Sequence, residues 1–253
     1  MSISVEKLYK VFQDPQQPEV AAVDRIEFQV RAGEIFGLLG PNGAGKTTTL
    51  RMLATLLRPT SGSASIAGHD LWKNPSHVRR SIGYLSADSG VYDRLTPREI
   101  VEHFGQLYGL SRSQVRDRTE ELFEHFSMGA HSDRLCMHLS SGIRQKVSII
   151  RSLVHSPPVL LLDEPTRSLD ILVARTVTDF IRQARQRGSC ILLSTHDMNE
   201  ASSLCDSFAI LHRGRILAQG ATHELETRFG GKSLEQLFFH TIEHDRGVPR
   251  VSK

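Results

Sequence analysis

The chain has 253 residues, which is enough for one or two domains that bury their own cores without disulfides or metals. Hydrophobic residues make up 39% and charged residues 23%, values that exclude a long disordered chain. The formal net charge of +3 is too small to indicate a nucleic-acid or acidic membrane surface as the partner.

The three cysteines, Cys136, Cys190 and Cys205, are far apart and form no CxxC pair. This pattern excludes a disulfide framework and a thiolate metal site. The first residues show no signal-peptide pattern, and nowhere do 18 apolar residues follow one another. We therefore expect a cytoplasmic protein that does not itself cross a membrane.

Short β-type runs separated by turn signals fill residues 1 to about 85, for example at 23–30 and 35–40. From Thr96 to about Gly129 the apolar spacing becomes helical, and Thr96, Pro97 and Glu99 resemble a helix N-terminus. From residue 157 apolar strands and helices alternate, and a short helix is expected after about residue 230. This order predicts an α/β fold with a mostly parallel sheet buried on both faces, and an inserted helical segment.

Residues 40–47 match the phosphate-binding pattern GxxxxGK[ST], with an apolar strand before them (35–39) and a helix expected after them (48–57). Glycines let the backbone N–H groups converge on phosphate oxygens, and the helix N-terminus adds a favourable dipole. In this pattern Lys46 contacts the β- and γ-phosphates, and the Thr47 hydroxyl binds Mg²⁺. The candidate residues for binding a nucleotide triphosphate here are Gly40, Pro41, Asn42, Gly43, Ala44, Gly45, Lys46, Thr47 and Thr48.

A second acidic element follows the apolar run 159–162, where Asp163 and Glu164 stand side by side. Strand alternation directs the two carboxylates differently, so that they can perform different tasks. Asp163 suits the Mg²⁺ shell, and Glu164 suits the general base that activates the attacking water. The NKxD element that GTPases use to recognise their base is missing.

The segment 139–146 (LSSGIRQK) resembles the LSGGQ signature of ATP-binding cassette (ABC) ATPases. The resemblance extends over roughly residues 3–225. It implies that Asp170 belongs to the D-loop and that His196 is the catalytic switch histidine beside Lys46 and Glu164. It also implies that an aromatic residue stacks on adenine, with Phe12 as the first candidate and Tyr9 as the second. The signature residues that would contact the ATP of a partner cassette are Ser140, Ser141 and Gly142.

The family implies one domain over residues 1–225, with a RecA-like P-loop core (1–87 and 157–225), a helical subdomain (about 88–156), and a tail at 226–253. It also implies Mg²⁺-dependent ATP hydrolysis in a head-to-tail dimer, because one chain carries two half-sites. The loop at residues 84–99 (the variant loop), the signature and the tail look most like the ATPases of bacterial export systems, including the sodium-export group. For these, a separate transmembrane permease, a position on the inner face of the cell membrane and no nucleic-acid partner are expected.

The chain departs from the family pattern at two places. Ala87 stands where most members have a glutamine that senses Mg²⁺ and the membrane partner, and Asp88 or Ser86 is a possible substitute. In the signature, Ser141 replaces a glycine and Ile143 replaces a glutamine. We expect the chain to hydrolyse ATP despite both changes. We also expect the loop around Ala87 to couple hydrolysis to the membrane partner in a different way.

Two alternative functions stay open. One is a soluble ABC ATPase that acts in DNA repair or on ribosomes. The DNA-repair type needs long coiled-coil arms, and too few residues separate Lys46 from Leu139 to form them. The ribosomal type usually carries two cassettes, and this chain carries one. The other is a binding-only regulatory cassette, which Ala87 suggests. It is opposed by the presence of Lys46, Asp163, Glu164 and His196.

Overall fold

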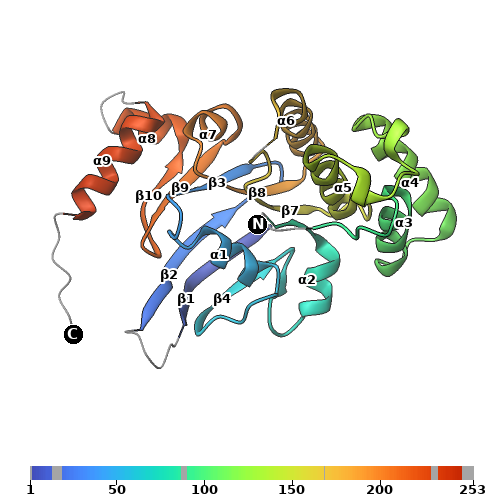
Figure 1. Ribbon diagram of the computed structural model, residues 1–253. Coiled ribbons are helices and arrows are strands. Elements are labelled where there is room, and N and C mark those ends of the chain that lie inside the picture. The colour runs from blue at the N-terminus through green and yellow to red at the C-terminus, as the bar shows by residue number, and fades with distance from the viewer. Residues whose placement is uncertain (1, 13–18, 87–89, 168, 229–232, 247–253) are drawn as a thin grey trace.

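The computed structural model describes residues 2–12, 19–86, 90–167, 169–228 and 233–246. Two sheets and their helices make up the fold (Figure 1). The first sheet is antiparallel, has the order β2-β1-β4-β5, and contains β1 (Ile3–Phe12), β2 (Val20–Val30), β4 (Ser61–Ile66) and β5 (His69–Asp70). The second has the order β10-β9-β3-β8-β7-β6 and contains β3 (Ile35–Leu39), β6 (Ile82–Leu85), β7 (Val159–Asp163), β8 (Cys190–Thr195), β9 (Ser207–His212) and β10 (Arg215–Ala221).

The second sheet is parallel except for β10, which pairs antiparallel with β9. Its central strands β3, β7 and β8 are buried along their whole length. In β3, Ile35 and Leu39 face one core cluster, while Phe36 and Leu38 face the other. Because side chains alternate along a strand, continuous apolar runs fit a sheet covered on both sides. The prediction of a mostly parallel sheet buried on both faces is therefore confirmed.

Helices cover this sheet. On one side α1 (Lys46–Leu53) lies between the two sheets, and its Leu50 and Met52 belong to the same core as β1 and β2. The other side is covered by α5 (Ser141–Leu153), α6 (Ile171–Gln186) and α7 (Met198–Leu204). The remaining helices are α2 (Pro75–Ser81), α3 (Pro97–Leu107), α4 (Arg112–His125), α8 (Thr222–Arg228) and α9 (Leu234–Arg246), with two short 3₁₀ turns, η1 (Gly129–His131) and η2 (Cys136–His138).

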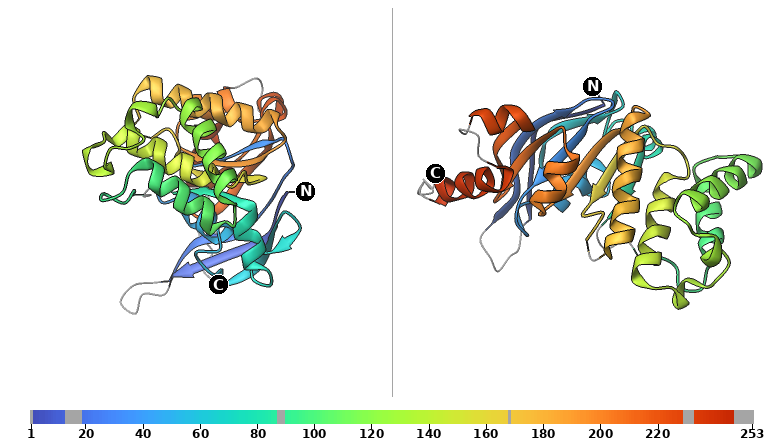
Figure 2. Two further views of the ribbon diagram at one scale, coloured as in Figure 1. Left: turned by 90° about the vertical axis from the view of Figure 1, so that its right-hand side faces the viewer. Right: turned by 90° about the horizontal axis from the view of Figure 1, so that it is seen from above.

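The expected helical insertion corresponds to the crossover from β6 to its parallel neighbour β7. It begins at α3, where Thr96 and Glu99 form a reciprocal capping box, and a second capping box starts α4. α3, α4 and α5 pack together at one end of the molecule (Figures 1 and 2).

Three features differ from the sequence expectation. The early strands form a separate antiparallel sheet, which the strand pattern alone did not predict. The helix after the phosphate loop, expected to extend to residue 57, ends at Leu53, because Thr55 adopts a left-handed φ of 61° and the Leu56 N–H returns to the Arg51 carbonyl. The expected boundary at residue 225 falls inside α8, and α9 packs on the core through the buried Leu234 and Leu237.

No helix among the described ranges is long and apolar enough to span a membrane. The carboxyl ends of β3, β8 and β7 lie side by side, because these three strands are parallel neighbours in that order. In open α/β sheets this edge is where ligands bind. The phosphate loop, Glu164 and His196 each follow one of these strands and therefore meet at one edge.

Candidate active site

The phosphate loop connects Leu39 at the end of β3 to Lys46 at the start of α1. Two of its glycines have no room for a side chain. A Cβ on Gly40 would lie 2.3 Å from the Leu211 carbonyl oxygen, and a Cβ on Gly45, where φ is 109°, would lie 2.4 Å from the Ala22 carbonyl oxygen. The glycines therefore allow a tight turn that directs the N-terminus of α1 outward.

A cavity of about 290 Å³ lies over this loop. All the predicted ATP-binding residues from Pro41 to Thr48 line it, and Gly40 directly precedes them; Ala22, Glu164 and Arg167 complete the lining. Lys46 is only 6% exposed. Its Nζ donates a hydrogen bond to the Gly40 carbonyl at 2.6 Å and lies 3.4 Å from Glu164 Oε1. A cavity lined by loop N–H groups and a buried ammonium suits a polyanion such as the phosphates of a nucleotide.

The Asp163 carboxylate, at the end of β7, is fully buried. Its Oδ1 accepts a hydrogen bond from Ser194 Oγ at 2.5 Å, while its Oδ2 has no partner among the described residues. A buried, unpaired carboxylate oxygen is costly unless a ligand satisfies it. Carboxylate and hydroxyl oxygens are the protein ligands that Mg²⁺ prefers, and Thr47 lines the cavity next to Lys46. The residues present therefore fit the predicted Mg²⁺ site.

Glu164 is the residue directly after β7 and is 8% exposed. Its φ of 50° is unusual for a residue other than glycine, and hydrogen bonds from its N–H to the Ser194 carbonyl and hydroxyl oxygens hold it there. This conformation places the Glu164 carboxylate between the Lys46 ammonium and the His196 ring. Oε1 faces Lys46, and Oε2 lies 2.7 Å from His196 Nδ1. Glu164 thus contacts both of the other side chains predicted as catalytic, Lys46 and His196.

The signature and the D-loop occupy the starts of neighbouring helices. Ser140 is the N-cap of α5, where its hydroxyl accepts a bond from the Ile143 N–H, and Asp170 is the N-cap of α6, where it accepts bonds from the Leu172 and Val173 N–H groups. A Cβ on Gly142 would lie 3.6 Å from Asp170 Oδ2, so the two helix starts are adjacent. Ser140 and Ser141 are exposed, and neither they nor Gly142 line the phosphate cavity.

Phe12 ends β1 and pairs with Val20 of β2, two residues before the cavity-lining Ala22. Its ring is 50% exposed, and Val20 is 64% exposed. An apolar surface beside a phosphate cavity suits the flat base of a nucleotide. The Lys10 ammonium lies 5.1 Å from the centre of the same ring.

The sequence analysis missed three contributors. Arg167 and Ala22 line the cavity, and Ser194 holds the Asp163 carboxylate. Only Arg167 carried a local signal, since it lies three residues after Glu164. Among the predicted residues, Ala87 and Asp88 lie outside the described part of the chain.

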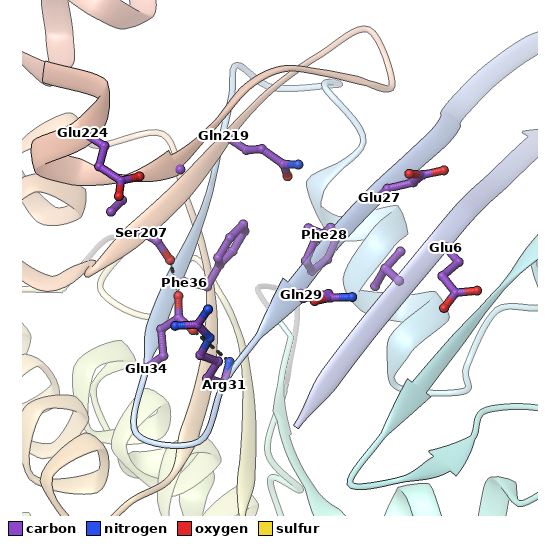
Figure 3. A pocket seen from close by; sticks show the side chains of 13 residues that line it. Glu6, Glu27, Phe28, Gln29, Arg31, Glu34, Phe36, Ser207, Gln219 and Glu224 are labelled. Atoms are coloured by element: carbon purple, nitrogen blue, oxygen red, sulfur yellow. Dashed lines mark hydrogen bonds between the residues drawn. The ribbon is translucent and has the colours of Figure 1, made fainter. Parts of the chain in front are cut away.

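A larger cavity of about 550 Å³ contains none of the motif residues (Figure 3). The stacked rings of Phe28 and Phe36, with centroids 5.2 Å apart, lie in its wall. Glu34 and Ser207 are hydrogen-bonded to each other there. The cavity lies between β2 and the segment from β10 to α8, away from the edge where the phosphate loop, Glu164 and His196 meet.

Comparisons with known proteins show the family of this chain. The profile of the ABC transporter family matches residues 23–167, more than half of the chain. The ABC transporter ATP-binding protein NatA of Bacillus subtilis is 40% identical over 91% of this chain and 94% of its own length. A Nod factor export ATP-binding protein of Ralstonia nicotianae is 36% identical over 93% of this chain and 72% of its own length.

One solved structure, the ATP-binding subunit of an ABC transporter, superposes with a TM-score of 0.87. It is 32% identical and covers 96% of this chain and all of its own. The chain therefore belongs to the ABC transporter family. It is an ATP-binding cassette with ATPase activity, and its fold is the P-loop α/β core of that family.

Proposed function

We propose that this cassette is the ATP-hydrolysing subunit of a membrane exporter, working as a head-to-tail dimer on the inner face of the cell membrane with a separate permease. The separation of the two halves of the site carries the proposal. Lys46 and Glu164 line the phosphate cavity, His196 contacts Glu164, and Asp163 directly precedes it. The signature residues Ser140 and Ser141 are exposed at the start of α5, and neither they nor Gly142 line the cavity. A second copy would bring its signature to this cavity.

ATP binding is assigned to the phosphate loop. The loop N–H groups and the α1 N-terminus bind the phosphate oxygens, and Phe12 stacks on the adenine. Lys46 faces Glu164 at 3.4 Å, close enough for the arriving phosphates to compete for the ammonium. That competition frees the Glu164 carboxylate to face the terminal phosphate.

Mg²⁺ is assigned to Thr47 and Asp163, since the buried Asp163 Oδ2 lacks a partner among the described residues. Bound there, the ion would supply charge neutralisation at the phosphates. The chain's own contribution is to hold the carboxylate in place, which the Ser194 hydroxyl does.

Hydrolysis is assigned to Glu164 as the general base and to His196 as its orienting partner. The carboxylate takes a proton from the attacking water, and the 2.7 Å contact with His196 Nδ1 fixes its direction. From the partner chain, the Ser140 hydroxyl and the Gly142 N–H at the start of α5 would contact the terminal phosphate. ATP would then join the two chains, and its hydrolysis would release them.

The membrane partner is assigned to a cavity of about 480 Å³ between the core and the inserted helices. Its lining includes Arg51 and Arg79 from the core side and Arg151 and Phe104 from the helical side. It also includes Ser86, which belongs to the variant loop. Three arginines and an aromatic ring favour a permease segment with an acidic side chain. The Nod factor export protein, similar over most of this chain, supports the exporter assignment.

The first prediction concerns Glu164. Glu164→Gln keeps the shape of the side chain and removes its basicity, so ATP hydrolysis should fall by at least about a hundredfold while ATP binding persists. ATP should then hold the chain as a dimer. Phosphate release and light scattering with ATP measure both effects, and turnover close to that of the unmodified chain would remove Glu164 as the base.

The second prediction concerns the membrane partner. Purification from gently solubilised native membranes should recover a polytopic membrane protein in equal amount. Arg79→Glu should reduce that recovery at least about tenfold by like-charge repulsion, with basal ATP hydrolysis unchanged. Arg80→Glu, on the same helix but outside the cavity lining, is the matched control. Recovery of the chain with ribosomes, with nucleic acid or with no partner would contradict the exporter assignment.

A further inference from the structure

Two loops carry the catalytic pair proposed above, and both are short. Glu164 directly follows β7, and His196 directly follows β8. The strands are parallel neighbours, with Asp163 opposite Ser194. The His196 side chain is 52% exposed, so packing does little to fix it. Its 2.7 Å contact with Glu164 therefore depends on how the two loops are held relative to each other.

A second contact joins the same two loops. The Thr166 hydroxyl, two residues after Glu164, donates a hydrogen bond at 2.7 Å to Glu200 Oε1, four residues after His196. Glu200 lies in α7, whose start Asp197 caps through bonds from the Asn199 and Glu200 N–H groups. The capped helix begins two residues after His196 and so fixes where the histidine backbone lies.

A partly buried carboxylate at position 200 does not by itself stabilise the fold. Burial raises the pKa of Glu200, and the negative charges of Asp197 and Glu164 add to this, while hydrogen bonds from the Thr195 and Thr166 hydroxyls oppose it. Thr195 directly precedes His196, and its hydroxyl also accepts the Asp197 N–H. The Glu200 side chain thus links Thr166, in the loop after β7, to Thr195, the last residue of β8 before His196.

We propose that Glu200 is a positioning residue, which keeps His196 within hydrogen-bonding distance of Glu164 by tying the loop after β8 to the loop after β7. The proposal rests on the roles given above to Glu164 and His196. Removal of the tie should misplace the pair by a fraction of an ångström to about 1 Å, a displacement that costs on the order of tenfold to a hundredfold in rate.

The test uses the full chain with Glu200→Ala, Glu200→Gln and Thr166→Val. Glu200→Ala should lower kcat for ATP hydrolysis at least about tenfold and leave KM within about twofold. Thr166→Val should have the same effect, and the double variant should lose little more, because both changes break one contact. Glu200→Gln should retain most activity, since its amide oxygen still accepts the Thr166 hydroxyl. Ser202→Ala, an exposed position on α7, is the control.

A crystal structure of each folded variant gives a readout independent of turnover. In Glu200→Ala the distance from His196 Nδ1 to Glu164 Oε2 should exceed 3.5 Å, and in Glu200→Gln it should stay near its present value. An unchanged distance and kcat in Glu200→Ala would overturn the proposal. So would equal losses in Glu200→Ala and Glu200→Gln. If the His196 Nδ1 to Glu164 Oε2 distance in Glu200→Ala exceeded 3.5 Å while kcat stayed unchanged, the role assigned to His196 would be removed. Glu200 would then remain the residue that positions His196.

Discussion

The two oxygens of the Asp163 carboxylate have different surroundings. Ser194 satisfies Oδ1, while Oδ2 is buried and has no partner among the described residues. This asymmetry suits a carboxylate that coordinates a metal ion: the Ser194 hydroxyl anchors one oxygen, and the other oxygen is available to the cation.

Asp163→Asn tests that division. The amide can keep the Ser194 bond through its oxygen, but it presents an N–H group where the cation is expected. Affinity for ATP should fall at least about tenfold with Mg²⁺ present and change less than about twofold in chelator. Titration of a fluorescent ATP analogue under both conditions measures this. Equal affinities with and without Mg²⁺ in the unmodified chain would remove the assigned Mg²⁺ site.

The sequence allowed a prediction of those site residues whose signal is local. Lys46 and Thr47 belong to one short strand–loop–helix segment, and Glu164 directly follows the apolar run of β7. The contacts that hold the site in shape join distant residues. Ser194 lies 31 positions from Asp163, and Glu200 lies 34 positions from Thr166. Serine, threonine and glutamate are common residues, so no pattern identifies such pairs before the fold brings them together.

At the scale of elements, helix starts were more predictable than helix ends. The N-terminus of α3 is encoded by adjacent residues, and the capping box of Thr96 and Glu99 forms as expected. The end of α1 depends on a left-handed residue, Thr55, that carries no glycine signal. The packing of α9 on the core could not be predicted from the sequence either, because an amphipathic pattern does not show which surface covers the apolar face of the helix.

Leu237 and Phe239 of α9 provide a matched pair. Leu237 is fully buried against the core, and the Phe239 ring is 55% exposed. Leu237→Ala should lower the free energy of unfolding by about 2–4 kcal/mol, and Phe239→Ala should change it by less than about 0.5 kcal/mol. Urea denaturation of both variants measures the difference. Similar small effects would mean that α9 behaves as a tail rather than as part of the core.

At the scale of the whole molecule, the apolar runs of β3, β7 and β8 predicted a sheet covered on both faces, and the structure agrees. The division of the strands into two sheets was not predictable. β1 pairs with both β2 and β4, and those pairings depend on which strands meet in space. The placement of α1 between the sheets follows from that division and directs the phosphate loop toward the edge shared by Glu164 and His196.

The proposed head-to-tail dimer makes a prediction about mixtures of variant chains. Lys46→Ala removes the ammonium from the phosphate cavity, and Ser140→Arg blocks the signature at the start of α5. Each variant alone should be inactive, because every site in its dimer lacks one component. In a mixed dimer, the cavity of the Ser140→Arg chain faces the intact signature of the Lys46→Ala chain, so one of the two sites is complete.

An equal mixture should therefore recover about a quarter of the unmodified turnover, since about half of the dimers are mixed and each has one working site. Phosphate release, measured as the ratio of the two variants is varied, should be greatest near equal amounts. A mixture of Lys46→Ala with Glu164→Gln is the control, because both changes damage the same half-site and no dimer regains a complete one. If the first mixture stayed as inactive as the control, each chain would have to complete its own site, and the exposed position of Ser140 away from the phosphate cavity would need a different explanation.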